Sequence, residues 1–79
     1  MDKKITIYST PTCPFCIRAK RFLDDNKIQY EDIDVSENQD RAQEMIKKSG
    51  QMGVPVIDID GGIIVGFDKE KIKETLGLK

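Results

Sequence analysis

Two cysteines, Cys13 and Cys16, constrain this chain more than any other feature of its sequence. They are the only cysteines among 79 residues, and Pro14 and Phe15 separate them. A short β-rich run ends just before the pair, and apolar residues at helical spacing follow it. Proline suits the first turn of a helix, where its missing N–H costs nothing. The sequence therefore predicts that Cys13 begins a helix and that Cys16 lies one turn further on.

This placement gives the two thiols different chemistry. Unpaired N–H groups and the positive end of the helix dipole face Cys13, so a thiolate there would be stabilised. Cys16 lies deeper and lacks those donors. One exposed nucleophile and one resolving thiol are what thiol–disulfide exchange requires, and the spacing allows a disulfide to close. Arg18, Lys20 and Arg21 lie within two turns of Cys13; they either support its thiolate or form a solvated helix face.

Three other interpretations of the pair stay open at this point. A structural disulfide is one, although a loop this short constrains the unfolded chain very little. Half of a zinc site is another, but zinc takes four ligands and the chain has no other cysteine and no histidine. Two buried, inert cysteines are the third. We expect redox chemistry and no bound metal.

Length and charge limit the classes of protein to be considered. Seventy-nine residues indicate one domain spanning residues 1–79. Thirteen basic and 14 acidic residues leave a net charge of −1, which does not support a nucleic acid or an anionic membrane as partner. No apolar stretch resembles a signal peptide or approaches the roughly 20 residues of a membrane span. We expect a cytoplasmic monomer, in which a Cys-x-x-Cys pair is more often catalytic or metal-binding than structural.

Periodicity and turn signals predict seven elements. Strands are expected at residues 5–9, 28–35, 54–59 and 63–65, and helices at residues 13–26, 36–49 and 68–76. The first strand is apolar enough to be central, whereas the second reads as an edge. The order β-α-β-α-β-β-α gives a right-handed parallel crossover followed by an antiparallel hairpin. The predicted fold class is α/β, with a four-stranded mixed sheet flanked by three helices.

Polar residues suggest where the second and third helices begin. Ser36 followed by Gln39 matches a capping box, so the second helix is expected to start at Ser36. Glu37 with Arg41, and Glu44 with Lys48, would then form ion pairs one turn apart on that helix. Asp68 is expected to cap the third helix.

The whole chain resembles the glutaredoxin family of the thioredoxin fold, and more narrowly a small dithiol glutaredoxin. The resemblance rests on the run Tyr-Ser-Thr-Pro-Thr-Cys-Pro-Phe-Cys at residues 8–16, then on Arg-Ala-Lys at 18–20, Ser-Gly at 49–50, Val-Pro at 54–55 and Gly-Phe-Asp at 66–68. A Cys-x-x-Cys alone is a weak signal, but the later motifs fall at suitable distances from it. The resemblance thus implies a thioredoxin fold.

The resemblance also implies an activity and a set of roles. The protein would be a thiol–disulfide oxidoreductase that reduces disulfides or glutathione mixed disulfides, with glutathione as co-substrate and disulfide-containing proteins as partners. Cys13 would form the mixed disulfide and Cys16 would resolve it, while Pro55 would be cis and face the cysteines. The N–H groups at the start of the third helix would receive the glutamyl end of glutathione. The glutathione-binding positions implied in this way are Thr10, Pro14, Phe15, Gln51, Val54, Pro55, Gly66, Phe67 and Asp68.

Two alternatives keep the fold and change the function. Thr10 and Gln51 occupy positions that carry basic residues in many glutaredoxins. Their uncharged side chains favour a related redoxin, which a thioredoxin-reductase-like flavoprotein would reduce and which would donate electrons to a reductase. The other alternative is an iron–sulfur cluster carrier, in which two chains share a cluster through Cys13 with help from glutathione. Pro14 argues against that carrier, because cluster-binding relatives more often have glycine there.

Overall fold

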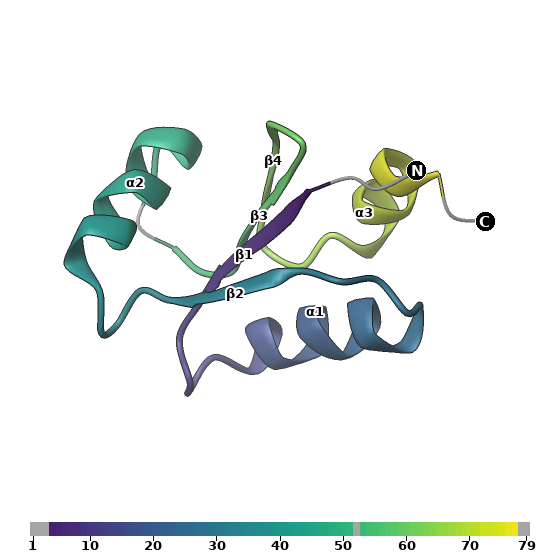
Figure 1. Ribbon diagram of the computed structural model, residues 1–79, viewed down its shortest axis with the longest axis horizontal. Coiled ribbons are helices and arrows are strands. Elements are labelled where there is room, and N and C mark those ends of the chain that lie inside the picture. Colours follow the sequence, from purple (N-terminus) through teal and green to yellow (C-terminus); the bar gives the residue numbers. More distant parts are fainter. Residues whose placement is uncertain (1–3, 52, 78–79) are drawn as a thin grey trace.

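The computed structural model describes residues 4–51 and 53–77 of the chain, and its elements follow the predicted order (Figure 1). They are β1 (Ile5–Ser9), α1 (Pro14–Asp25), β2 (Glu31–Asp34), α2 (Gln39–Ser49), β3 (Val56–Ile59), β4 (Gly62–Val65) and α3 (Lys69–Leu76). The strands form one sheet in the order β2-β1-β3-β4. β1 pairs parallel with β2 and antiparallel with β3, and β3 pairs antiparallel with β4. The predicted α/β class and mixed sheet are confirmed.

The sheet is covered on both faces because the side chains of β1 alternate between two cores. Ile5 and Ile7 pack with residues of α1 and α3, whereas Tyr8 packs with Met45 of α2. Figure 1 shows α2 lying apart from α1 and α3, across the sheet from them. All five residues of β1 are buried, so this strand is central, as predicted, and β2 is an edge.

The register of the strands gathers three separate segments at one end of the sheet. Tyr8, near the end of β1, lies opposite Val56 at the start of β3. Val56 in turn lies opposite Val65 at the end of β4. Three segments therefore meet at the same end of the sheet: the loop that follows β1, the residues that precede β3 and the residues that follow β4. These segments carry the cysteine motif, the Val-Pro motif and the Gly-Phe-Asp motif.

A tight hairpin turn joins β3 to β4 at the opposite end of the sheet. Asp60 and Gly61 have φ angles of 53° and 96°, and Ile59 pairs with Gly62 across the turn. Two consecutive positive φ angles match the type I′ turn that suits the twist of a hairpin. The predicted turn is confirmed, with Gly62 as the first residue of β4.

Two predicted strands are shorter in the structure than in the sequence analysis. β2 was expected at residues 28–35, but only Glu31–Asp34 pair with β1. The chain first turns at Lys27, which has a φ of 59°, and Ile28 then donates its backbone N–H to the carbonyl of Leu23 at the end of α1. β3 begins at Val56 rather than at residue 54, because Pro55 has no N–H to donate to the ladder.

The predicted start of the second helix is wrong by several residues. Asn38 is the N-cap of α2, and its side chain accepts the backbone N–H of Arg41 at 3.2 Å. Ser36 instead donates both its N–H and its hydroxyl to the carboxylate of Asp34. Glu37 therefore lies outside the helix, and Arg41 forms its ion pair with Glu44, at 3.5 Å, rather than with Glu37.

The start of α3 and the ends of α2 and α3 lie at residues that commonly cap helices. Asp68 caps α3, as predicted, and Gly50 and Gly77 end α2 and α3 with φ angles of 78° and 72°. These left-handed conformations are the ones in which glycine carries no Cβ penalty. No helix within residues 4–51 and 53–77 combines the length and the apolar character needed to cross a membrane.

Candidate functional site

Cys13 occupies the N-cap of α1, where the sequence predicted it. Its sulfur accepts the backbone N–H of Cys16 at 3.1 Å, so one of the free donors of the helix start points at the thiol. Its own N–H donates to the carbonyl of Thr10 at 3.4 Å, which closes the loop that leads from β1. Pro14 is the first helical residue and is exposed. Cys13 itself is half-buried, and so it is the more exposed of the two cysteines.

Cys16 lies one turn into α1 and is completely buried. Burial raises the pKa of the Cys16 thiol to about 12, and its hydrogen bond with Cys13 acts in the same direction. The backbone of Thr10 and the charge of Lys20 act in the opposite direction. Both cysteines are free thiols. The structure thus places a half-buried cysteine at the helix start and a fully buried cysteine one turn behind it.

The segment before β3 contacts Cys13 from across the sheet end. The thiol of Cys13 lies 3.8 Å from the carbonyl oxygen of Val54, to which it donates a hydrogen bond. The Val54–Pro55 peptide bond is cis, as the resemblance implied, and Pro55 is buried. The carbonyl of Pro55 accepts the N–H of Gly66 at 2.8 Å, which ties the end of β4 to this segment. Residues from three distant parts of the sequence therefore meet beside Cys13.

Phe15 is the exposed residue of the cysteine motif. Its side chain is 55% exposed, and the guanidinium of Arg18 lies 5.7 Å from the centroid of its ring. Lys20 turns the other way and pairs with Asp32 of β2. The three basic residues near Cys13 therefore do not converge on its thiol: Arg18 covers Phe15, Lys20 reaches the sheet, and Arg21 is exposed.

The segment Gly66-Phe67-Asp68 leads from β4 into α3. Gly66 has a φ of 79°, a conformation that L side chains rarely adopt. Phe67 is half-buried, and its ring packs against the core on the α1 side, 6.1 Å from the ring of Phe22. Asp68 is exposed and its carboxylate accepts the N–H of Lys71 at 3.1 Å. The side chain of Phe67 thus serves packing, so its backbone is what it can offer to a ligand.

Gln51 is held by its own loop. Its N–H and its carbonyl both bond to the hydroxyl of Ser49 at the end of α2. Among the predicted site residues, direct contacts join Thr10, Cys16 and Val54 to Cys13, and one backbone bond joins Pro55 to Gly66. The contacts of Gln51 and Asp68 are instead with residues of their own segments.

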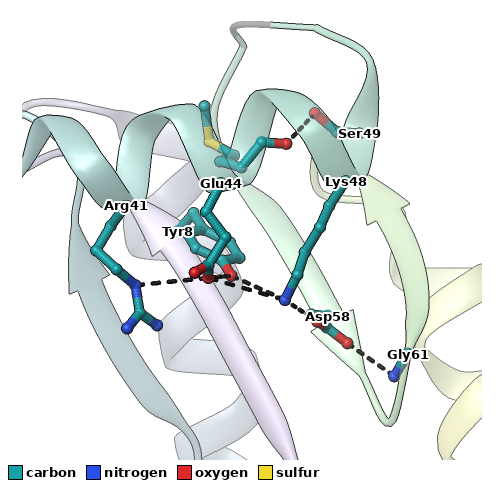
Figure 2. A network of polar contacts seen from close by, with 8 residues as sticks. Tyr8, Arg41, Glu44, Lys48, Ser49, Asp58 and Gly61 are labelled. Carbon is teal, nitrogen blue, oxygen red and sulfur yellow. Dashed lines mark hydrogen bonds and ion pairs between the residues drawn. The ribbon is translucent and has the colours of Figure 1, made fainter.

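The sequence analysis missed two polar networks that join helices to the sheet, apart from the predicted Glu44–Lys48 pair of the first, which is confirmed at 3.8 Å. Figure 2 shows the first, in which Tyr8 of β1 donates its hydroxyl hydrogen to Glu44 of α2 and accepts from Lys48, which also binds Asp58 of β3. The second joins Ser9, Lys20 and Asp32 beneath α1; Ser9 is buried. Both depend on which face of the sheet each strand residue occupies, and the strand register decides that. The alternation of Ile33 with acidic neighbours in β2 was a signal that could have located Asp32.

The fold and the site together define a class, that of thioredoxin-fold proteins with a redox-active pair of cysteines. The glutaredoxin family model matches residues 5–64, a span that includes both cysteines and Pro55. The chain belongs to the glutaredoxin family.

Individual relatives agree with this assignment. The chain is 47% identical over 72 residues to a protein of Clostridium pasteurianum described as an uncharacterized glutaredoxin-like 8.6 kDa protein in the rubredoxin operon, covering 91% of this chain and 96% of that one. It is 39% identical over 64 residues to glutaredoxin 3 of Escherichia coli K12, covering 81% and 77%. The solved structure of the glutaredoxin-like protein NrdH-redoxin from Escherichia coli superposes with a TM-score of 0.81 at 25% identity, covering 90% and 92%.

Proposed function

We propose that the protein is a glutathione-coupled thiol–disulfide oxidoreductase. The Cys13 thiolate attacks a mixed disulfide between glutathione and a substrate, and the other thiol leaves. Glutathione then reduces the intermediate on Cys13, or Cys16 displaces it and glutathione reduces the resulting disulfide. The observation that carries the proposal is the difference in exposure between the two cysteines, since Cys13 is half-buried at a helix start and Cys16 is completely buried behind it.

The surroundings of Cys13 support a peptide-like thiol as the substrate. The Val54 carbonyl lies against the Cys13 thiol, so an extended peptide bound at Cys13 can pair with the Val54 backbone as an added strand. The start of α3 offers backbone N–H groups to a carboxylate, and the charge of Asp68 suits an amine beside it. Glutathione carries both groups at its glutamyl end. Thr10, Pro14, Phe15 and Gln51 complete the site that we propose for it.

The test is a coupled assay with the reduced protein, a glutathione mixed disulfide, glutathione, glutathione reductase and NADPH. We expect NADPH consumption that Cys13→Ser abolishes, because the nucleophile is lost, and that Cys16→Ser preserves through the route needing only Cys13. Turnover that survives in Cys13→Ser would show that the roles of the two thiols are wrongly assigned.

A second candidate is a redoxin that a flavoprotein reductase keeps reduced. Thr10 and Gln51 put no positive charge where the glycine carboxylate of glutathione would be held, and this favours a donor other than glutathione. The structural similarity to NrdH-redoxin from Escherichia coli, which is described as having a thioredoxin-like activity profile, supports the same alternative. Thioredoxin reductase and NADPH would then reduce the Cys13–Cys16 disulfide, while the glutathione assay would give no turnover.

We further propose that residues 1–79 act as a single glutaredoxin-like domain and as a monomer in the cytoplasm. The described strands share one sheet, and both cores are built on it. A Cys-x-x-Cys pair in a chain with no other cysteine fits a cytoplasmic redox protein better than a structural disulfide framework.

A further inference from the structure

A short polar network lies beneath the first turns of α1. The hydroxyl of Ser9 donates to one carboxylate oxygen of Asp32 at 2.8 Å, and the ammonium of Lys20 donates to the other at 2.9 Å. Ser9 is the last residue of β1 and is 1% exposed, so this end of the network is fixed by the sheet. The side chain of Lys20 is 23% exposed, and half-burial of this kind limits screening of its charge.

Lys20 and Cys16 lie on the same face of α1, and the charge of Lys20 lowers the pKa of the Cys16 thiol. The two residues are four apart on α1, which brings their Cβ atoms to about 5–6 Å on one helix face. Helical side chains lean toward the helix N-terminus, so the Lys20 side chain extends over the turn that holds Cys16. Ser9, at the other end of the network, directly precedes Thr10. A hydrogen bond with the Thr10 backbone lowers the pKa of the Cys16 thiol.

We propose that Lys20, held in place by Asp32, is a positioning residue that stabilises the Cys16 thiolate as it forms in the resolving step. The proposal rests on the proposed function, in which Cys16 attacks a mixed disulfide on Cys13. It answers a difficulty that the structure raises. Burial opposes the loss of the Cys16 proton, and Lys20 is the cation whose charge favours that loss.

The resolving step itself is a balanced exchange. Cys16 loses its proton to solvent, and its thiolate attacks the Cys13 sulfur. A bond forms between the two cysteine sulfurs as the bond between Cys13 and the partner sulfur breaks. The partner leaves as a thiolate and takes up a proton from solvent. One disulfide and one thiol are consumed and one of each is formed, so no further oxidant or reductant is needed.

Several charged groups surround the two residues that the proposal involves. Three groups affect the pKa of Cys16. Cys13, at the helix start, raises it, whereas the backbone of Thr10 in the preceding loop and the charge of Lys20 lower it. Lys20 is paired with Asp32 of β2. Its other neighbours share a surface hollow of α1 and the loop before β2, and they are Ile17, Arg21, Asp24, Asp25 and Tyr30. Arg21 is thus a nearby cation that no ion pair ties to β2 in the described structure, and it serves as a matched control.

The experiment separates the two cysteines in time. The reduced protein is mixed with the uncharged reagent 2,2′-dithiodipyridine in a stopped-flow instrument, and release of thiopyridone is followed by absorbance. The first release reports attack by Cys13, and the second reports displacement by Cys16 within the same molecule. Because the reagent is neutral, a change in protein charge does not alter its capture. Wild type, Lys20→Met, Lys20→Arg and the control Arg21→Met are compared between pH 5 and 10.

We expect Lys20→Met to slow the second release by about threefold near neutral pH. Losing a nearby cation at an effective dielectric between water and protein raises a thiol pKa by about one unit, which is about tenfold in thiolate. The greater nucleophilicity of a more basic thiolate offsets about half of that effect on a logarithmic scale. Because the pKa of Cys16 is about 12, the second release should rise with pH throughout pH 5 to 10 and stay slower in Lys20→Met at each pH, while Lys20→Arg and Arg21→Met keep both releases near wild type.

Three results would overturn the proposal. They are an unchanged second release in Lys20→Met, an equal slowing of both releases, and a failure of Lys20→Arg to restore the second release. A first release that persists in Cys13→Ser would instead contradict the proposed function. The two failures are therefore distinguishable within one set of traces.

Discussion

Asp68 shows how one side chain can serve the fold and the proposed site together. Its carboxylate accepts the N–H of Lys71 and so caps α3. The same exposed carboxylate follows Gly66, which is bonded to Pro55 near Cys13. Capping requires only an acceptor oxygen, whereas recognition of an amine requires a negative charge. The two roles can therefore be separated by substitution.

Replacing Asp68 in two ways tests this separation. Asp68→Ala removes the cap and is expected to lower the free energy of unfolding by about 1 kcal/mol. Asp68→Asn keeps an acceptor oxygen, so its free energy of unfolding should stay within a few tenths of wild type, about the difference between good caps. Both variants should raise the KM for a glutathione mixed disulfide in the coupled assay. A KM unchanged in Asp68→Asn would show that the carboxylate is a cap alone.

The helix α2 is held to the sheet by polar contacts as well as by its apolar face. Tyr8 is completely buried, yet its hydroxyl reaches Glu44 and Lys48 at the edge of the core, as Figure 2 shows. Lys48 continues to Asp58 at 2.8 Å, and so three elements are joined. The network therefore fixes the helix whose end leads into the loop before Val54.

Removal of the Tyr8 hydroxyl measures this anchor. Tyr8→Phe keeps the ring in the core but deletes two hydrogen bonds, and we expect a loss of about 1 kcal/mol in the free energy of unfolding. Tyr30→Phe is the matched control, because Tyr30 is a half-exposed tyrosine packed on the other core. Guanidinium unfolding of both variants gives the comparison. Because the Tyr30 hydroxyl is hydrogen-bonded to Asp24, equal effects at the two positions would show that the α2 network stabilises the fold no more than that single bond does.

The same helix shows where the sequence could not decide between local signals. Ser36 and Asn38 are both good N-cap residues, and only the position of the sheet selects Asn38. Ser36 is hydrogen-bonded to the carboxylate of Asp34 and so does not cap the helix. The position of Asp34 at the end of β2 depends in turn on its pairing with Ser9 of β1. Asp68 had no such competitor, and its cap was predicted correctly. Local signals therefore sufficed where one residue fitted a role, and tertiary pairing decided where two did.

For the molecule as a whole, the charge network on α2 makes stability depend on pH. Burial raises the pKa of Asp58, but the Lys48 ammonium and the Gly61 N–H outweigh it, so the pKa is lowered overall. The hydrogen bond from Tyr8, with the nearby cations, lowers the pKa of Glu44. A carboxyl group whose pKa is lowered by folding stabilises the native state above its unfolded pKa of about 4. That stabilisation is lost as the pH falls through the folded value.

Thermal unfolding between pH 3 and 7 tests this dependence with Asp58→Asn. The amide keeps an acceptor for the Gly61 N–H but cannot carry the charge that pairs with Lys48. We expect wild type to have the higher Tm at pH 7, and the gap between the two proteins to narrow below about pH 4, where the carboxyl groups take up protons. A gap of the same size at pH 3 and pH 7 would show that the charge of Asp58 is not the cause.

The sequence predicted the arrangement of the site better than its electrostatics. The resemblance to glutaredoxins implied that Pro55 faces the cysteines, and in the structure the segments that hold Val54 and Gly66 meet at the same end of the sheet as Cys13. The contacts of Lys20 and Tyr8 were not predictable in the same way, because each depends on a strand register that no local pattern encodes. Polar partners across a sheet become visible only when the strands are aligned.

The burial of Cys16 has a consequence for how long a partner stays attached. In the proposed reaction, a partner held on Cys13 would be released either by Cys16, at a rate that does not depend on other thiols, or by free glutathione, at a rate that rises with the glutathione concentration. At one particular concentration of glutathione, these two rates of release would be equal. Below that glutathione concentration, attack by Cys16 would set how long the partner stays bound to Cys13. Above it, attack by free glutathione would do so. In the proposed reaction, the burial of Cys16 would thus set the glutathione concentration above which the solution, rather than the protein, controls the lifetime of the mixed disulfide.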